Sequence, residues 1–301
     1  MALTFRDYSS DLVEAAHSVL LELVHLLGEY HDDIVVVGGW VPQLILPAEP
    51  LKHVGSIDVD LAFNHSNLQE AGYATIQALL LSRGYEQYHR QPFIFHRTVN
   101  VGGNPIKVQV DFLAGEYEGT GKGHRTQKVH EGRARKARGC DLAFDLFVET
   151  RIGGELPGGG MDQTTVRVSS VVAFLVMKGM ALFDRLKEKD AWDIYFTLTN
   201  YPGGLDALAR EIQPHARRGL VREGLGKIAD KFATVAHMGP KFVADFEDVQ
   251  DAEDRAARMR DAFEKVDYLL RSLKIRWTLS GMSGYLSSGL PAGSRDHKRQ
   301  P

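Results

Sequence analysis

Residues 34–39, Ile-Val-Val-Val-Gly-Gly, and residues 57–61, Ile-Asp-Val-Asp-Leu, decide the fold of the first half of this chain. The β-branched run before the two glycines predicts a buried strand that ends in a tight turn. Strict alternation of apolar and acidic residues over 57–61 predicts a second strand with one buried face. Residues 40–46 have the pattern of a short helix. Strands and helices therefore follow one another closely here.

The flanking residues extend this mixture of helices and strands. Ser9 or Ser10 can cap a first helix, and Gly84 is a plausible stop for a second. A glycine-rich segment at 102–105 predicts a hairpin turn between two further strands. The expected helices are residues 10–30 and 67–83, and the expected strands lie near 93–99 and 106–113. Strands and helices mixed in this way predict an α/β or α+β first domain, and we adopt α+β.

The second half is predicted to be mostly helical. Residues 115–139 are polar and show no clear period, 140–149 resemble a strand, and 153–160 form a glycine-rich connector. The expected helices cover residues 170–186, 189–199, 205–237 with breaks, and 251–272. We expect an α+β domain at 1–162, a mainly helical domain at 163–279 and a disordered tail at 280–301.

Composition limits the classes of function. The chain has 301 residues, 44% of them hydrophobic and 25% charged, and a net charge of -3. Nucleic-acid binding would therefore need a local basic patch. Cys140 is the only cysteine, so neither an internal disulfide nor a cysteine zinc site is possible. The apolar stretch 171–183 is too short to span a bilayer, and no signal peptide is evident. We expect a cytoplasmic protein without membrane contact.

Three aspartates form a candidate metal site. Asp58 and Asp60 share one strand face, with Cα atoms about 6.5–7 Å apart, a spacing that suits one hard cation or a pair. Asp111 lies with Lys107 and Gln109 on the polar face of the strand near 106–113. If the two strands are neighbours, the three carboxylates converge, as two-metal phosphoryl transfer requires. The alternative is that each strand simply has one solvated face.

The Gly38-Gly39 turn is a candidate phosphate-binding element. Glycine lets the backbone approach a phosphate closely, and a following helix offers free N–H groups to an anion. The alternative is a tight turn that only packing requires. The position of the turn, upstream of Asp58, favours the phosphate-binding interpretation.

Gly38-Gly39, Asp58-x-Asp60 and Asp111 together resemble the motifs of the polymerase-beta-like nucleotidyltransferase superfamily. In the helical half, Lys178, Arg185 and residues 189–195, Lys-Asp-Ala-Trp-Asp-Ile-Tyr, resemble the Lys…Arg…Lys-Asp-x-x-Asp-Leu segment of the AbiEii/AbiGii toxin family. Those proteins are the nucleotidyltransferase toxins of type IV toxin–antitoxin systems. The resemblance covers about residues 34–198 and implies a nucleotidyltransferase-fold mixed sheet with flanking helices.

The resemblance also implies roles for individual residues. Two magnesium ions would be held by Asp58, Asp60 and Asp111. Lys178 would contact phosphate, and Asp190 or Asp193 would orient the acceptor or act as base. The residues assigned to nucleotide binding are Gly38, Gly39, Lys52, Ser56, Lys178 and Arg185. The chain departs from the family pattern at Gly39, where many relatives have Ser, and at Phe196, where toxin members often have Lys or Arg. It also departs in the stretch Lys52-His53-Val54-Gly55-Ser56, where the family often has an Arg and only Lys52 or His53 could substitute.

Lys178 also has an interpretation that is independent of any family. It is the one charged residue in the apolar stretch 171–183. A buried ammonium without a partner is costly, so a carboxylate or a phosphate should lie beside it. Asp190 and Asp193 are three residues apart and share one helical face. The alternatives are therefore a core salt bridge to one of these aspartates, or contact with a phosphate. Asp190 can also be a helix-start carboxylate that only favours the dipole.

A basic segment at 122–138 is the local patch that a nucleic acid would need. It contains seven Lys or Arg residues and one opposing Glu131. These charges can bind the phosphates of a nucleotide or of an RNA acceptor, although charge runs are often solvated surface. The segment contains no aromatic residue, so base stacking is not expected there.

The leading hypothesis is magnesium-dependent transfer of a nucleoside monophosphate from a nucleoside triphosphate to an acceptor, with release of pyrophosphate. The acceptor would be an RNA or tRNA end or a protein hydroxyl, and the resemblance adds a toxin role and a cognate antitoxin. One alternative is a nucleotide-binding module without turnover, motivated by Gly39, Val54 and Phe196. Another is a metal-dependent phosphohydrolase that uses the same aspartates.

Overall fold

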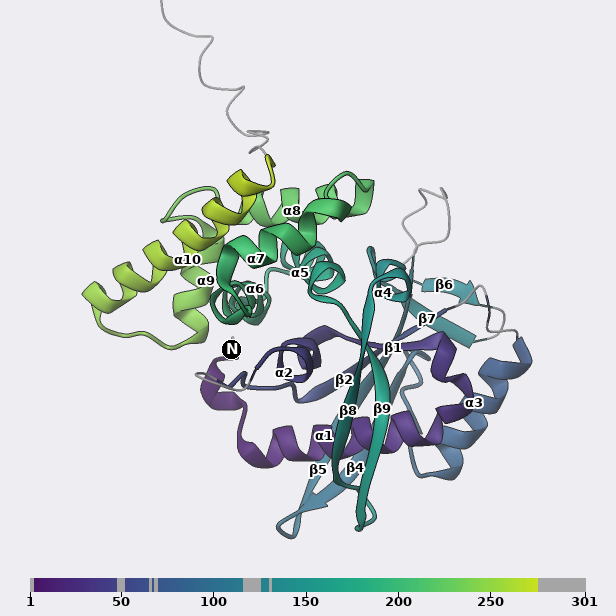
Figure 1. Ribbon diagram of the computed structural model, residues 1–301. Helices are drawn as coiled ribbons and strands as arrows, with labels where there is room; N and C mark the ends of the chain where they lie inside the picture. Colours follow the sequence, from purple (N-terminus) through teal and green to yellow (C-terminus); the bar gives the residue numbers. More distant parts are fainter. Residues whose placement is uncertain are drawn as a thin grey trace, which may run out of the picture.

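The computed structural model of this chain describes residues 3–47, 52–64, 67, 70–115, 126–129 and 132–275. Strands dominate the first half and helices the second, so the fold is α+β (Figure 1). The strands are β1 (Ile34–Val37), β2 (Asp58–Phe63), β3 (Glu86–Gln87), β4 (Ile94–Val101), β5 (Asn104–Ala114), β6 (Thr126–Val129), β7 (Gly132–Lys136), β8 (Phe147–Glu155) and β9 (Met161–Ser169). The helices are α1 (Ser10–Leu26), α2 (Val41–Ile45), α3 (Glu70–Ser82), α4 (Leu142–Asp145), α5 (Val171–Arg185), α6 (Glu188–Asn200), α7 (Gly204–Ile212), α8 (Gly219–Lys231), α9 (Met238–Phe246) and α10 (Ala252–Ser272).

Seven strands of one mixed sheet follow the order β3-β4-β5-β2-β1-β9-β8, and β7, paired with β6, runs parallel to the end of β5 beside this path. β2 runs parallel to β5 and antiparallel to β1, and β1 runs parallel to β9. The hairpins β4–β5 and β8–β9 supply the antiparallel flanks. The two strands that carry the acidic residues, β2 and β5, are therefore neighbours in the middle of the sheet. Each of them is hydrogen-bonded to a strand on both sides.

β1 is apolar throughout because both of its faces are covered. Ile34 and Val36 belong to the main hydrophobic core, together with buried residues of α1 such as Leu20. Val35 and Val37 face the other way and pack with Cys140 and other small or branched side chains. This arrangement confirms the buried strand predicted from the β-branched run and explains why it shows no alternation.

α1 lies across one face of the sheet (Figure 1) and contacts β2, β4, β5, β8 and β9. The hydroxyl of Ser9 accepts a hydrogen bond from the Leu12 N–H and so caps the helix, as expected from the sequence. Leu20 and Leu23 are fully buried on the sheet-facing side. Burial of each such leucine contributes about 1.5–3 kcal/mol.

Helices α5 to α10 gather beside the sheet and share its core. The main cluster of buried apolar side chains runs without a break from α1 to the end of α10. α5 and α8 approach each other very closely through two glycines. A Cβ added at Gly179 would lie 2.3 Å from the carbonyl oxygen of Gly224, and one added at Gly224 would lie 2.8 Å from the Val176 Cα. Larger side chains at these positions would push the helices apart.

The predicted helices and strands around the central sheet agree with the structure, but four segments differ. Residues 115–139 contain the β6–β7 hairpin, in which backbone pairing needs no side-chain period. Residues 140–149 were predicted as a strand, yet Cys140 and Ala143 pack at helical spacing onto the β1 face, and α4 forms before β8 begins. The glycines at the start of 153–160 lie within β8, paired with β9, and a Cβ on Gly154 would lie only 3.2 Å from the His17 ring of α1.

The fourth difference is α9, which the sequence prediction left unassigned. Gly239-Pro240 reads as a turn signal. The structure places both residues in the first turn of α9, where a proline costs no backbone hydrogen bond. The predicted domain boundary at 162 and 163 falls inside β9, so the sheet continues to Ser169 and the helices begin at Val171. The predicted disordered tail, 280–301, lies outside the described residues. Within the part of the chain that is described, no helix has the length and apolarity that crossing a membrane requires.

Candidate active site

The acidic residues of β2 and β5 lie on one face of the sheet. In the parallel ladder Asp60 pairs with Asp111, and Asp58 pairs with Gln109. Paired residues in adjacent strands point to the same side, and so do residues two apart in one strand. Asp58, Asp60 and Asp111 therefore converge on one face, as expected if the strands were neighbours. Their placement agrees with the predicted site and leaves their roles open to experiment.

The Gly38-Gly39 turn packs directly against this acidic row. Gly38 follows β1 with a φ of 71°, and a Cβ added there would lie 2.0 Å from Asp60 Oδ2. A Cβ added at Gly39 would lie 2.4 Å from Ser56 Oγ. Both the backbone conformation and the space thus require glycine at Gly38, and space alone requires it at Gly39. The turn comes within contact distance of Asp60 and of the Ser56 hydroxyl beside Asp58.

Neutral donors hold the carboxylates in place. Ser56 Oγ donates to Asp58 Oδ1 at 2.6 Å, and Gln109 Nε2 donates to both carboxyl oxygens of Asp111 at 3.1 and 3.2 Å. Trp40 Nε1 donates to the backbone carbonyl of Asp58 at 2.8 Å. These bonds orient the acidic side chains without neutralising their charge.

The charges of the three aspartates repel one another. Loss of contact with water, followed by the charges of Asp58 and Asp111, raises the pKa of Asp60 to about 8, and Arg185 and Lys178 only partly oppose this rise. A divalent cation would remove the repulsion, because three carboxylates and a hydroxyl form an all-oxygen donor set of the kind magnesium prefers. Among the residues that the structure describes, no three His, Cys, Asp or Glu side chains already stand close enough to hold a metal ion. The donor chemistry fits magnesium, and the three side chains would have to move closer together to share one ion.

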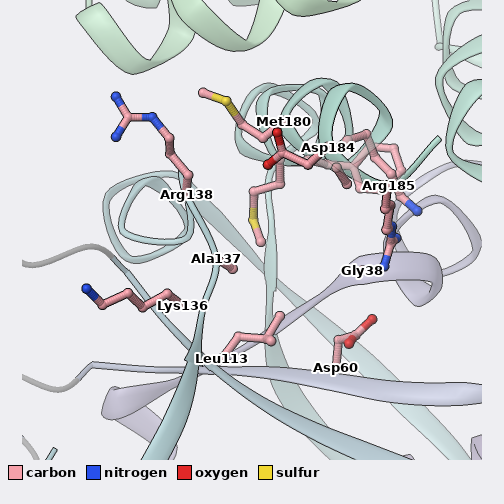
Figure 2. A pocket seen from close by; sticks show the side chains of 13 residues that line it. Gly38, Asp60, Leu113, Lys136, Ala137, Arg138, Met180, Asp184 and Arg185 are labelled. Atoms are coloured by element: carbon pink, nitrogen blue, oxygen red, sulfur yellow. The ribbon is translucent and has the colours of Figure 1, made fainter. Parts of the chain in front are cut away.

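A pocket opens beside the acidic row, between the sheet and α5. Gly38 and Asp60 line one end, and Arg185 extends from α5 toward them (Figure 2). Lys136 and Arg138 stand at the other side, at the end of β7 and just after it. The remaining lining residues are Leu113, Ala137, Phe174, Met177, Lys178, Met180, Ala181 and Asp184. The pocket thus combines cationic groups with apolar walls next to the carboxylates.

Lys178 lies in a buried ion network. Its ammonium is 2.8 Å from Asp190 Oδ1 and 2.6 Å from Asp193 Oδ2, and only 7% of its side chain is exposed. Arg185 donates two hydrogen bonds to Asp190 at 2.7 and 2.8 Å. Burial alone would raise the pKa of Asp190, but Lys178 and Arg185 outweigh it and lower that pKa to about 2. The structure therefore shows the core salt bridge that the sequence allowed, at the edge of the pocket.

Asp193 is fully enclosed by partners. Lys178, Lys189 at 2.8 Å and His53 at 2.9 Å all contact its carboxylate, which has no exposed surface. Burial would raise the pKa of Asp193, but Lys178 and Lys189 hold it well below its usual range. A carboxylate so fully paired is suited to positioning α6 against the loop before β2. Its predicted role as a base or acceptor-orienting group would need these contacts to rearrange.

His53 and Lys189 are two residues of this network to which the sequence assigned no definite role. His53 Nδ1 accepts the Gly55 N–H at 3.0 Å, so the ring proton must reside on Nε2, which donates to Asp193. Burial lowers the pKa of His53 to about 4, against the opposing effect of Asp193, so this ring is neutral. The sequence signals were that Lys189 is the first residue of the Lys-Asp-x-x-Asp segment and that His53 lies shortly before Asp58.

Two further predicted binding elements are Lys52 and the basic segment 122–138. Lys52 is exposed and stands near His17 of α1, whose pKa is lowered by burial and by the Lys52 charge. Within the basic segment 122–138, the described side chains are those of residues 136–138. Lys136 and Arg138 line the pocket, and Arg138 also pairs with Glu223 of α8 at 2.6 Å.

Comparisons with known proteins do not assign a family. No protein-family model matches the chain, and searches of curated proteins and of solved structures likewise found no match. The resemblance to the AbiEii/AbiGii toxin family therefore stays a prediction that rests on the motifs quoted above.

Proposed function

We propose that this chain is a magnesium-dependent nucleotidyltransferase that moves a nucleoside monophosphate from a nucleoside triphosphate to an acceptor hydroxyl. The observation that carries the proposal is the parallel pairing of Asp60 with Asp111, with Asp58 on the same face and Gly38 against Asp60. Acidic residues grouped in this way beside a close-approaching glycine turn are suited to phosphoryl chemistry. On this basis we also propose that the mixed sheet and its helices form a nucleotidyltransferase fold.

In the proposed reaction, the acceptor oxygen attacks the α-phosphorus as its proton passes to water, and the bond from the α-phosphorus to the bridging oxygen breaks so that pyrophosphate leaves with that oxygen. Asp58, Asp60 and Asp111 would hold magnesium, which supplies Lewis-acid stabilisation of phosphate oxygens when bound. Gly38 and Gly39 bring bare backbone against Asp60 and Ser56, where a Cβ would clash, so the turn itself can approach a phosphate at the carboxylates without a side chain in between. The remaining residues of the pocket bind and orient the substrate.

The pocket residues fit a nucleotide in two ways. Arg185, Lys136 and Arg138 offer positive charge to phosphates. Phe174 and Met177 offer an apolar wall to a base or ribose. We further propose an RNA or tRNA end as acceptor, approached through residues 122–138, and a toxin role with a cognate antitoxin. These last proposals follow from the resemblance and from the basic character of that segment.

A label-transfer assay tests the proposed activity. The purified chain is incubated with each α-labelled nucleoside triphosphate, magnesium and total RNA, and both RNA and protein are examined for label. Transfer by the unmodified chain and its loss in the Asp58→Ala/Asp60→Ala double variant would support the proposal. Equal behaviour of the two proteins would refute catalysis by these residues. Release of inorganic phosphate without a labelled acceptor would instead indicate hydrolysis, and binding without any product would indicate a module that has lost turnover.

A further inference from the structure

The two ends of the central sheet differ in how much edge they present. At one end, β3 contributes only Glu86 and Gln87. At the other end, all nine residues of β8 run along the edge, and each of them pairs with β9 on its inner side. The β8–β9 hairpin is the long strand pair in Figure 1. A long edge strand leaves N–H and C=O groups with which another strand can pair.

Every second residue of β8 directs its backbone groups away from β9. Leu146 and Leu156, which flank the strand, form backbone hydrogen bonds with Ser170 and Gly160 on the β9 side. Inward and outward groups alternate along an antiparallel pair, so the odd-numbered residues of 147–155 direct their N–H and C=O groups outward. Within the part of the chain that the structure describes, no strand pairs with these outward groups.

The β8 edge lacks the features that usually prevent pairing with another chain. Natural sheets protect an edge by making the strand short, as in β3, or by a proline, a lysine or a bulge. β8 contains neither proline nor lysine, and its pairing with β9 continues one to one without a bulge. Val148, an apolar side chain that is 41% exposed, lies on this strand. The edge is therefore suited to a strand partner.

The charges on β8 indicate which partner fits. Glu149 and Arg151 share one face of the strand, on either side of Thr150. The Glu149 side chain is 52% exposed and lies 3.6 Å from Arg167 Nε of β9, whereas Arg151 is exposed and forms no ion pair with any described residue. A second β8 strand, antiparallel to the first and centred on Thr150, sets Glu149 opposite Arg151 at two places. The strand is thus complementary to itself.

Other antiparallel registers are less favourable. A pair centred one residue away, on Glu149 or Arg151, sets like charges opposite each other. A pair centred on Ile152 sets Glu149 opposite Glu155. Centres nearer either end of β8 shorten the pairing. The favoured centre joins residues 147–153 of the two copies through about eight backbone hydrogen bonds.

We propose that β8 is a dimer interface, at which two copies of this chain pair their β8 strands antiparallel about Thr150 and join their sheets. Val148 of each copy then lies opposite the partner's Ile152 in a close, non-hydrogen-bonded pair, which covers the exposed valine. A two-fold pair of this kind closes on itself, so it gives a dimer rather than a filament. The inference is independent of the proposed function, since no residue of β8 lines the pocket beside the acidic row.

Sedimentation velocity over a range of protein concentrations tests the interface. The unmodified chain is compared with Glu149→Arg and Arg151→Glu, each of which sets like charges opposite each other at both places in the dimer. Glu155→Arg is the matched control, because it changes a charge on the same strand beyond the paired segment. We expect the unmodified chain to form a species of twice 33.5 kDa. Each of the first two variants should weaken dimerisation by at least about tenfold, and the control should not.

An equimolar mixture of Glu149→Arg and Arg151→Glu tests the register. One copy now has two arginines at the edge and the other has two glutamates, so both cross-strand pairs in a mixed dimer again have opposite charges. We expect the mixture to dimerise about as strongly as the unmodified chain, a result that also requires both variants to be folded.

A Thr150→Cys variant tests the two-fold centre by cross-linking. Opposite Cα atoms in a non-hydrogen-bonded pair lie about 4.5 Å apart, within the range of a disulfide, and the natural Cys140 is buried. We expect a disulfide-linked dimer on mild oxidation. A monomeric unmodified chain, undiminished dimerisation of the single charge variants, a mixture that stays monomeric, or no cross-link would each overturn the inference. None of these outcomes bears on nucleotidyl transfer, which the label-transfer assay measures separately.

Discussion

Gly38→Ala is the substitution that examines the acidic site most closely. At a φ of 71°, an alanine pays about 1–2 kcal/mol for the left-handed backbone. Its Cβ would also lie 2.0 Å from Asp60 Oδ2, so the carboxylate must move, and overpacking of this kind costs about 1–3 kcal/mol more. We therefore expect a total loss of about 2–5 kcal/mol in the free energy of unfolding. Urea unfolding, followed by far-ultraviolet circular dichroism, measures this loss.

Gly103→Ala is the matched control for this substitution. Gly103 has a φ of 86°, and nothing lies within 4 Å of an added Cβ, so only the backbone penalty applies. The same two variants are unfolded with and without magnesium. An ion at a hundred times its dissociation constant stabilises the folded state by about 2.7 kcal/mol. This gain should persist in Gly103→Ala and disappear in Gly38→Ala. Equal unfolding energies and an equal magnesium effect in the two variants would refute the close approach of Gly38 to a cation site.

Three further predictions concern the network and the helix packing. Lys178→Met should lower the free energy of unfolding by about 3–5 kcal/mol in urea titrations, because it leaves buried carboxylates undercompensated, and a loss below about 1 kcal/mol would contradict the buried ion network. Because the folded state keeps His53 neutral down to about pH 4 while the unfolded chain protonates near pH 6.5, stability should fall by up to about 3 kcal/mol as the pH drops between these values. His53→Gln should lack that contribution. Asp60, whose pKa is raised in the folded state, makes the folded state more stable as the pH falls over the same range. The difference between the pH profiles of the two proteins therefore isolates the contribution of His53. In α8, Gly224→Ala should destabilise the fold by about 1–3 kcal/mol, whereas Gly226→Ala, which meets nothing within 4 Å, should stabilise it by about 0.5–1 kcal/mol in thermal unfolding.

The sequence was most informative where one local pattern fully determines a backbone. Four β-branched residues before Gly38-Gly39 could only be a buried strand and turn, and the alternation around Asp58 and Asp60 fixed which face they share. The hairpin at Gly102 and Gly103 was equally clear. These features predicted β1, β2 and the β4–β5 hairpin because strand periodicity and glycine conformation are read from residues that are close in sequence.

The remaining features depend on contacts that no local pattern reports. That Asp60 pairs with Asp111 rather than with a residue one step away is a matter of register, which the sheet sets as a whole. The choice of Lys178 between a phosphate and two aspartates needed the packing of α5 against α6. The tautomer of His53 followed only from its two hydrogen-bond partners, and the hairpin at β6 and β7 from backbone pairing.

Manganese binding, followed by electron paramagnetic resonance, tests most directly whether the three aspartates act as one cation site. The unmodified chain is compared with Asp58→Asn, Asp60→Asn and Asp111→Asn, and with Asp32→Asn, whose side chain is 81% exposed at the far end of β1. Each of the first three variants should weaken the same site by at least about tenfold, because each removes one charged ligand. Asp32→Asn should bind like the unmodified chain. Undiminished manganese binding in Asp60→Asn or Asp111→Asn would contradict a shared metal site at the centre of the sheet.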